Sequence, residues 1–139
     1  MFELDVRLQS SCFFLIDWPL SQVLLKNESA FPWLILVPRR ANMQEIYQLN
    51  SADQVSLIKE IHHVSKIMQD FFQPQKLNIA SLGNIVSQLH IHCVARTKTD
   101  SLWPQGIWQP SYQSVSYDES VAKKKVFELK KRLLQVKFD

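Results

Sequence analysis

The most informative stretch of this chain is Gln88-Leu89-His90-Ile91-His92-Cys93-Val94-Ala95-Arg96. Its apolar residues favour a β-strand, in which alternate side chains point to the same face. The polar face of that strand would carry Gln88, His90 and His92, while the residues between them enter a core. Two of the four histidines of the chain are therefore expected side by side.

A turn that contains a glycine and an amide precedes this strand. Residues 78–84 are Asn-Ile-Ala-Ser-Leu-Gly-Asn and include one of only two glycines among 139 residues. Glycine lets backbone N–H groups approach a phosphate closely, and the Asn84 amide adds a hydrogen-bond donor. Placed before two histidines, this turn favours a phosphate pocket with a nucleophile in it.

These residues resemble the histidine-triad (HIT) signature of nucleotide hydrolases and transferases, in which three histidines alternate with apolar residues. The segment is most similar to a bacterial branch in which the first histidine is Gln and an aromatic tail follows, here residues 100–108. Residues 24–27 and 33–38 also look like the paired strands of the family. The resemblance covers residues 2–110 in the right order.

The resemblance implies roles for the residues of the signature. The middle histidine of the family is the nucleophile, which corresponds to His90, and the third corresponds to His92, which would bind a phosphate or bridging oxygen. A neutral imidazole, with an ordinary pKa of ~6.5, can form a nucleotidyl-histidine and leave again. Gln88 replaces the first histidine and Trp33 stands where many members have another. Because Gln cannot titrate, acid–base chemistry at this position is altered.

Further binding residues are expected around the two histidines. The resemblance places Gly83 and Asn84 in the phosphate-binding turn, and Asn27 where the family hydrogen-bonds the ribose hydroxyls. Arg96 ends the strand, where a cation could neutralise phosphate charge; a solvated strand-end charge is the alternative. The aromatic candidates for a lid or for stacking on a base are Trp103 and Trp108. These two indoles fit loop packing equally well.

The pattern along the chain predicts an α+β domain with an antiparallel sheet of about five strands, one main helix and a C-terminal helix. Capping boxes at Ser51 and Ser116 predict the starts of the two helices, and Pro74 follows the end of the first. The expected strands are Cys12–Asp17, Val23–Lys26, Trp33–Val37, Lys76–Ser81 and Ser87–Arg96. The apolar seam of the terminal helix needs a partner surface on its own chain or on a second subunit.

Composition limits the function further. The net charge of +3 comes from residues 112–139, which hold seven Lys/Arg and four Asp/Glu, whereas residues 1–111 hold nine of each. We therefore expect a HIT-like catalytic domain over 1–111, a basic helical extension over 112–139, and no nucleic-acid partner. No apolar run approaches the ~20 residues of a membrane span. Two cysteines without metal-ligand spacing and no signal-peptide pattern indicate a cytoplasmic protein.

The predicted function is hydrolysis or transfer at the α-phosphate of a nucleotide conjugate, either a dinucleoside polyphosphate or a nucleoside phosphoramidate. The resemblance also implies a homodimer. No cofactor and no protein-bound metal are expected, although Mg²⁺ is compatible with substrate phosphates. The first alternative is a non-catalytic nucleotide-binding sensor with a degenerate triad. A His-x-His metal site and a pure interaction protein acting through the terminal helix are weaker alternatives.

Overall fold

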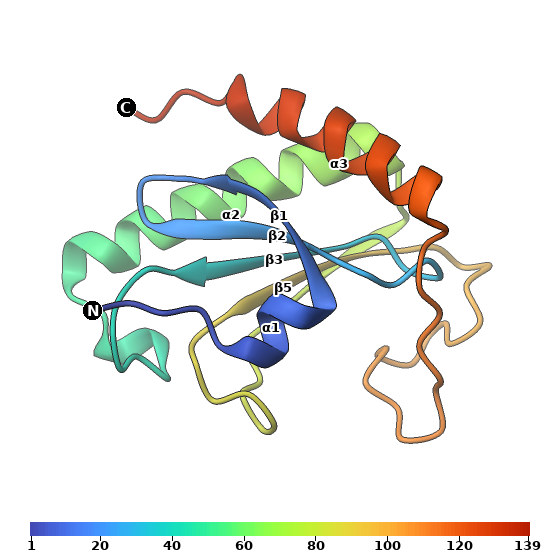
Figure 1. Ribbon diagram of the computed structural model, residues 1–139, viewed down its shortest axis with the longest axis horizontal. Helices are drawn as coiled ribbons and strands as arrows, with labels where there is room; N and C mark the ends of the chain where they lie inside the picture. The colour runs from blue at the N-terminus through green and yellow to red at the C-terminus, as the bar shows by residue number, and fades with distance from the viewer.

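The computed structural model describes residues 1–139, which form an antiparallel sheet with helices on both faces (Figure 1). The sheet has five strands in the order β1-β2-β3-β5-β4, and every pair of neighbours is antiparallel. The strands are β1 (Cys12–Asp17), β2 (Ser21–Lys26), β3 (Trp33–Pro38), β4 (Lys76–Ala80) and β5 (Ile91–Arg96). The predicted α+β class and the five strands are confirmed.

The helices divide between the two faces of the sheet. Helices α2 (Ser51–Phe72) and α3 (Glu119–Leu134) cover one face, and the short α1 (Val6–Ser11) lies on the other (Figure 1). A short 3-10 turn, Ile46–Gln48, precedes α2. None of these helices is long and apolar enough to cross a membrane.

Alternation along the strands explains why both faces are covered. Leu34 and Leu36 of β3 join the main core beneath α2 and α3, whereas Ile35 and Val37 pack with Leu8 of α1 on the opposite face. In a strand, neighbouring residues point to opposite sides, so a continuous apolar run requires cover on both. His92, opposite Ile35 in the register, consequently faces the α1 side.

The strand that carries the histidines is shorter than predicted. β5 begins at Ile91, so Gln88 and His90 lie in the segment before it rather than in the ladder. The backbone N–H of Leu89 donates to the carbonyl of Met43 (2.9 Å), a loop residue outside the sheet. This contact satisfies the backbone locally and explains why pairing with β3 begins only afterwards.

The N-caps of the two predicted helices lie one residue before Ser51 and two residues after Ser116. The N-cap of α2 is Asn50, whose side chain accepts from the N–H of Asp53 (2.8 Å). α3 begins at Glu119 after Asp118, because the N–H of Tyr117 donates to the Asn27 side chain and holds that segment outside the helix. Helix α1 was not predicted; six residues provide too few turns for a periodic signal.

Helix α3 packs on its own chain. Leu129 and Leu133 are fully buried in the core that also contains residues of the sheet and α2. The Trp18 indole N–H donates to the carbonyl of Leu133 (3.3 Å). The apolar side of the terminal helix therefore packs against its own chain.

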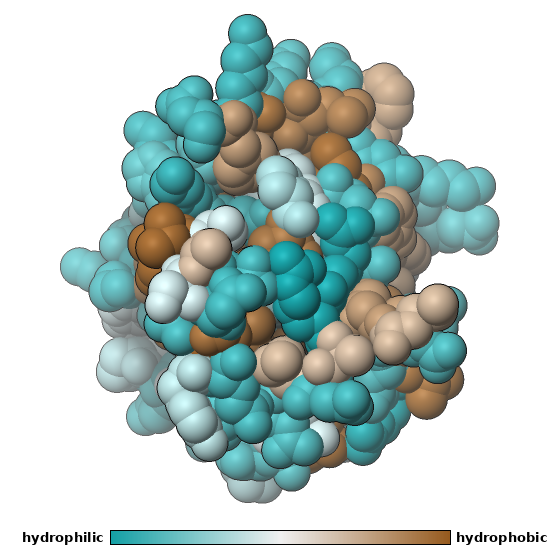
Figure 2. Space-filling view, turned by 90° about the vertical axis from the view of Figure 1, so that its left-hand side faces the viewer, coloured by the Kyte–Doolittle hydropathy of each residue, from teal (hydrophilic) through white to brown (hydrophobic).

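The face in Figure 2 shows hydrophilic side chains with separate apolar patches between them.

Candidate functional site

A cavity of about 400 Å³ opens on the α1 side of the sheet. Its walls come from α1, the ends of β2 and β3, the loop before β5 and the aromatic tail. The polar or charged lining residues are Arg7, Ser11, Lys26, Asn84, His90 and His92; the others are Leu8, Trp33, Ile35, Leu82, Gly83, Ile85, Val86 and Trp108. The cavity thus collects both histidines, the glycine turn and one of the two candidate tryptophans.

His90 is held so that one ring nitrogen remains free. The ring is buried, and its Nδ1 lies 2.6 Å from the backbone carbonyl oxygen of Gln88. Because a carbonyl only accepts, Nδ1 carries the proton in this bond. In the neutral ring Nε2 is then unprotonated and has its lone pair available for attack on phosphorus.

His92 lies against His90 in an edge-to-face arrangement, with ring centroids 4.7 Å apart. Its Nδ1 is 3.0 Å from the indole Nε1 of Trp33, and its ring also contacts Trp108 (5.1 Å between centroids). Burial, together with the nearby His90 and Lys26, lowers the pKa of His92 to about 3. His92 is therefore neutral at ordinary pH.

The glycine turn forms one rim of the cavity. Gly83 has φ of +83°, in the region that residues with a Cβ rarely adopt, and the exposed Asn84 follows it. The Arg7 guanidinium donates to the carbonyl of Ile85 (3.0 Å) and so ties this turn to α1. The turn and the two histidines therefore line the same cavity.

Two cations at the cavity were missed by sequence reasoning. Lys26 ends β2; its Nζ donates to the Ser11 hydroxyl (3.0 Å) and lies 5.4 Å from the centroid of the Trp33 ring. Arg7 is more exposed and pairs with Asp5 (2.9 Å). Hydrogen bonds from Arg7 hold the pKa of the Asp5 carboxyl below its usual range. The position of Lys26 at the cavity could have been predicted, because side chains alternate along β2 and Lys26 is on the same face as Leu24. Nothing in the sequence around Arg7 indicated that it would reach the cavity.

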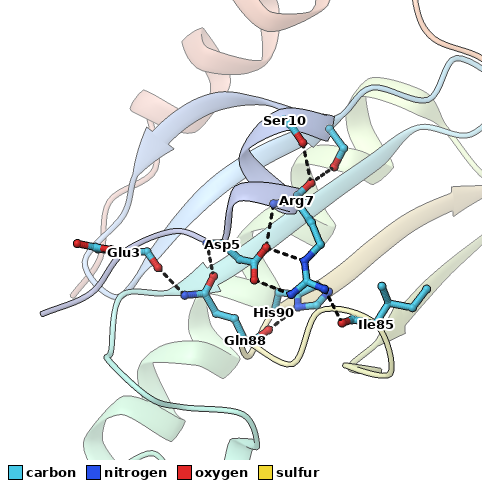
Figure 3. Close-up of polar contacts among 8 residues, drawn as sticks. Glu3, Asp5, Arg7, Ser10, Ile85, Gln88 and His90 are labelled. Atoms are coloured by element: carbon cyan, nitrogen blue, oxygen red, sulfur yellow. Dashed lines mark hydrogen bonds and ion pairs between the residues drawn. The ribbon is translucent and has the colours of Figure 1, made fainter.

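The side chain of Gln88 fastens the N-terminal segment instead of lining the cavity (Figure 3). Its Oε1 accepts from the N–H of Asp5 (2.9 Å), and its Nε2 donates to the carbonyl of Glu3 (2.8 Å). Both polar atoms of the amide are thus hydrogen-bonded to the backbone, and the structure does not bring this expected catalytic side chain into the cavity. Only the main-chain carbonyl of Gln88 contacts a histidine.

Arg96 and Asn27 also lie away from the cavity. The guanidinium of Arg96 is buried, pairs with both carboxylate oxygens of Asp100 (2.7 and 3.0 Å) and donates to Asn78 (3.1 Å). Asn27 accepts from the N–H of Tyr117 and fixes the chain before α3. The structure does not bring these two side chains, expected to contact phosphate and ribose, to the cavity, because their polar groups bind the protein itself.

The two candidate tryptophans have different positions. Trp108 is partly exposed at the cavity and makes an edge contact with Trp33, at 6.0 Å between centroids. Trp103 lies over the Arg96 guanidinium at 5.7 Å and does not line the cavity. Of the two tryptophans, only Trp108 is therefore placed to act as a lid or to contact a base.

No three His, Cys, Asp or Glu side chains are grouped so as to hold a metal ion.

Comparisons with known proteins found a matching family model and similar solved structures. The HIT domain family model matches residues 7–99. A histidine triad protein from Marinobacter aquaeolei VT8 is 36% identical, with a TM-score of 0.93 and coverage of 99% of both chains. One from Bradyrhizobium japonicum is 37% identical (TM-score 0.90, 94% of this chain and 97% of that one). One from Sinorhizobium meliloti 1021 is 34% identical (TM-score 0.89, 94% and 96%).

No curated protein matches the chain in sequence. The family model nevertheless spans more than half of the chain, from α1 to the loop after β5, and includes both cavity histidines. The three solved structures extend the likeness over α3 as well. The chain therefore belongs to the HIT domain family.

Proposed function

We propose that this protein hydrolyses or transfers the nucleotidyl group of a nucleotide conjugate through a covalent intermediate on His90. The observation that carries the proposal is the hydrogen bond from His90 Nδ1 to the Gln88 carbonyl (2.6 Å), which leaves Nε2 as the nucleophile in a cavity with two cations. Membership of the HIT family fits nucleotide binding and this type of chemistry.

In the first step, His90 Nε2 attacks the α-phosphorus. A phosphorus–nitrogen bond forms while the bond to the leaving group breaks, and the leaving group takes that electron pair. The ring, now bonded to phosphorus and still protonated at Nδ1, carries a positive charge. The Gln88 carbonyl oxygen faces this charge at 2.6 Å and stabilises it. In the second step, water displaces His90, which releases a nucleoside monophosphate and a proton and restores the ring.

Positive groups at the cavity offset the negative charge on the transferring phosphate. Lys26 at the end of β2 and Arg7 on α1 both line the cavity, and the backbone around Gly83 supplies N–H donors. Donors that are positioned before the reaction lower the barrier because they need no reorganisation. The apolar wall of Leu8 and Ile35 leaves a surface suited to a base or sugar.

The substrates in this proposal are dinucleoside polyphosphates and nucleoside phosphoramidates.

We also propose that the protein is a homodimer. The outer edge of β4 is unpaired in the sheet, and Ile79 on this strand is 43% exposed. An edge of this kind is a surface on which a second copy can pair. Sedimentation of the purified protein would decide this point, since a monomeric mass at assay concentrations would contradict it.

The test is release of nucleoside monophosphate from a panel of both substrate classes, with wild-type protein, His90→Ala and His62→Ala. His62 lies on α2, outside the cavity, and serves as the matched control. We expect release by the wild type and by His62→Ala, and loss of at least ~1000-fold in His90→Ala. Undiminished release by His90→Ala would refute the nucleophile. Binding of AMP or GMP without release from any substrate would support the sensor instead.

A further inference from the structure

The indole of Trp33 makes the one hydrogen bond that determines how His92 is protonated. Trp33 on β3 and His92 on β5 are diagonal neighbours across the strand pair, since Trp33 is opposite Val94 and His92 is opposite Ile35. The donor and acceptor, Trp33 Nε1 and His92 Nδ1, are 3.0 Å apart. An indole N–H can only donate, so Nδ1 of His92 must present its lone pair.

This bond fixes the tautomer of His92. With Nδ1 unprotonated, the single proton of the neutral ring is on Nε2. Adding a second proton would place an N–H on Nδ1 against the N–H of Trp33, two donors facing each other. The ring is 6% exposed, which leaves little room for it to turn away.

The charged groups around His92 also disfavour addition of a second proton to its ring. Lys26 from β2 lies beside the Trp33 ring, and His90 lies against His92 from the segment before β5. The other charged groups at the cavity are Arg7 and its partner Asp5, at the start of α1. No carboxylate is hydrogen-bonded to His92, so nothing offsets the cost of charging it. The low pKa of His92 agrees with this geometry.

We propose that Trp33 is a positioning residue that holds the neutral His92 ring as an Nε2–H donor, and that this makes conjugates whose leaving group departs as an anion the preferred substrates. The inference rests on the proposed function. A neutral imidazole N–H can donate a hydrogen bond to a phosphate or bridging oxygen, but it does not give up its proton near neutral pH. His92 would therefore stabilise charge without acting as a general acid.

This preference follows from the electron balance of the first step. When His90 attacks a phosphoanhydride, the bridging oxygen takes the electron pair of the broken bond and leaves as a stable phosphate anion. When it attacks a phosphoramidate, the nitrogen takes that pair and must also receive a proton to leave as an amine. A fixed neutral His92 does not supply this proton. We therefore assign phosphoanhydrides, rather than phosphoramidates, as the preferred substrate class.

The first arm of the test measures the tautomer directly. Two-bond nitrogen–proton NMR correlations of the wild-type histidine rings should show His92 as the Nε2–H form from about pH 5 to about pH 9. In Trp33→Phe, which retains an aromatic ring and removes the donor, His92 should lose the fixed tautomer. Trp18→Phe is the matched control, because Trp18 also donates through its indole, to Leu133 and far from the cavity. It should leave the His92 signals unchanged.

The second arm compares kcat/KM for an anhydride and an amidate of the same nucleoside. The wild type should prefer the anhydride. Trp33→Phe should reduce this preference about tenfold, the effect of one hydrogen bond, because Nε2 of His92 no longer always carries the proton that it donates to the bridging oxygen of the anhydride. An Nδ1–H tautomer in the wild type, titration of His92 near neutral pH, or an unchanged preference in Trp33→Phe would overturn the inference. Wild-type turnover of neither substrate would instead overturn the proposed function, while the NMR arm would still decide what Trp33 does.

Discussion

The buried ion pair between Arg96 and Asp100 gives a stability prediction with a magnitude that follows from the structure. The side chains are 1% and 7% exposed, and they share two hydrogen bonds. The Arg96 hydrogen bonds also hold the pKa of the Asp100 carboxyl below its usual range. Replacing Asp100 with Ala leaves the guanidinium buried with Asn78 as its remaining polar partner. Breaking a buried pair in this way costs about 3–5 kcal/mol, or a fall in Tm of roughly 10–20 °C.

Urea unfolding of the wild type, Asp100→Ala and Glu119→Ala measures this cost. Glu119 forms an i,i+4 pair with Lys123 in which both side chains are largely exposed, so its loss should change little. Because Arg96 does not line the cavity, folded Asp100→Ala should keep the KM of the wild type. A cost for Asp100→Ala no greater than that for Glu119→Ala, or a raised KM with stability retained, would contradict a structural role for this ion pair.

Three further predictions concern the N-terminal segment, the buried histidine and the terminal helix. Gln88→Ala should raise the exchange rate of the Asp5 amide about tenfold or more, because its acceptor is lost; unchanged exchange would contradict the proposed fastening. The low pKa of His92 means that the unfolded chain binds an extra proton between about pH 6.5 and about pH 3. The free energy of unfolding should therefore fall by up to about 1.4 kcal/mol per pH unit as pH decreases through this window, and a His92→Gln variant that showed the same slope would refute this. Leu129→Ala should cost about 2–5 kcal/mol in urea unfolding, and a cost below about 1 kcal/mol would show that α3 is not part of the core.

Much of the fold could be predicted because its signals are local. The apolar run at Trp33–Pro38 and the periodic residues of α2 each reflect burial of the element that contains them. Alternation at 88–92 also correctly placed His90 and His92 at one site, even though His90 lies just outside β5. The boundaries were less predictable, because they depend on contacts with distant residues such as the bond from Tyr117 to Asn27.

The roles of polar side chains were harder to predict for the same reason. Gln88, Asn27 and Arg96 stood at plausible positions along the chain, but their side chains bind other parts of the protein. Conversely, Arg7 reaches the cavity only because α1 packs beside the turn at residue 85. Residue type and spacing indicate which chemistry a site can perform; they do not show which polar groups tertiary contacts have already satisfied.

The proposed function requires that His90 carries the nucleotidyl group during the reaction, and trapping this intermediate tests that requirement. Wild-type protein, His90→Ala and His92→Gln would be mixed with a dinucleoside polyphosphate and stopped within milliseconds in alkaline denaturant, which preserves a phosphorus–nitrogen bond. Mass spectrometry of the intact chains and their peptides would follow. We predict that one nucleoside monophosphate group, less water, is attached to His90 in the wild type and absent in His90→Ala. A monophosphate product formed by the wild type with the label on another residue, or a label that persists in His90→Ala, would contradict the account.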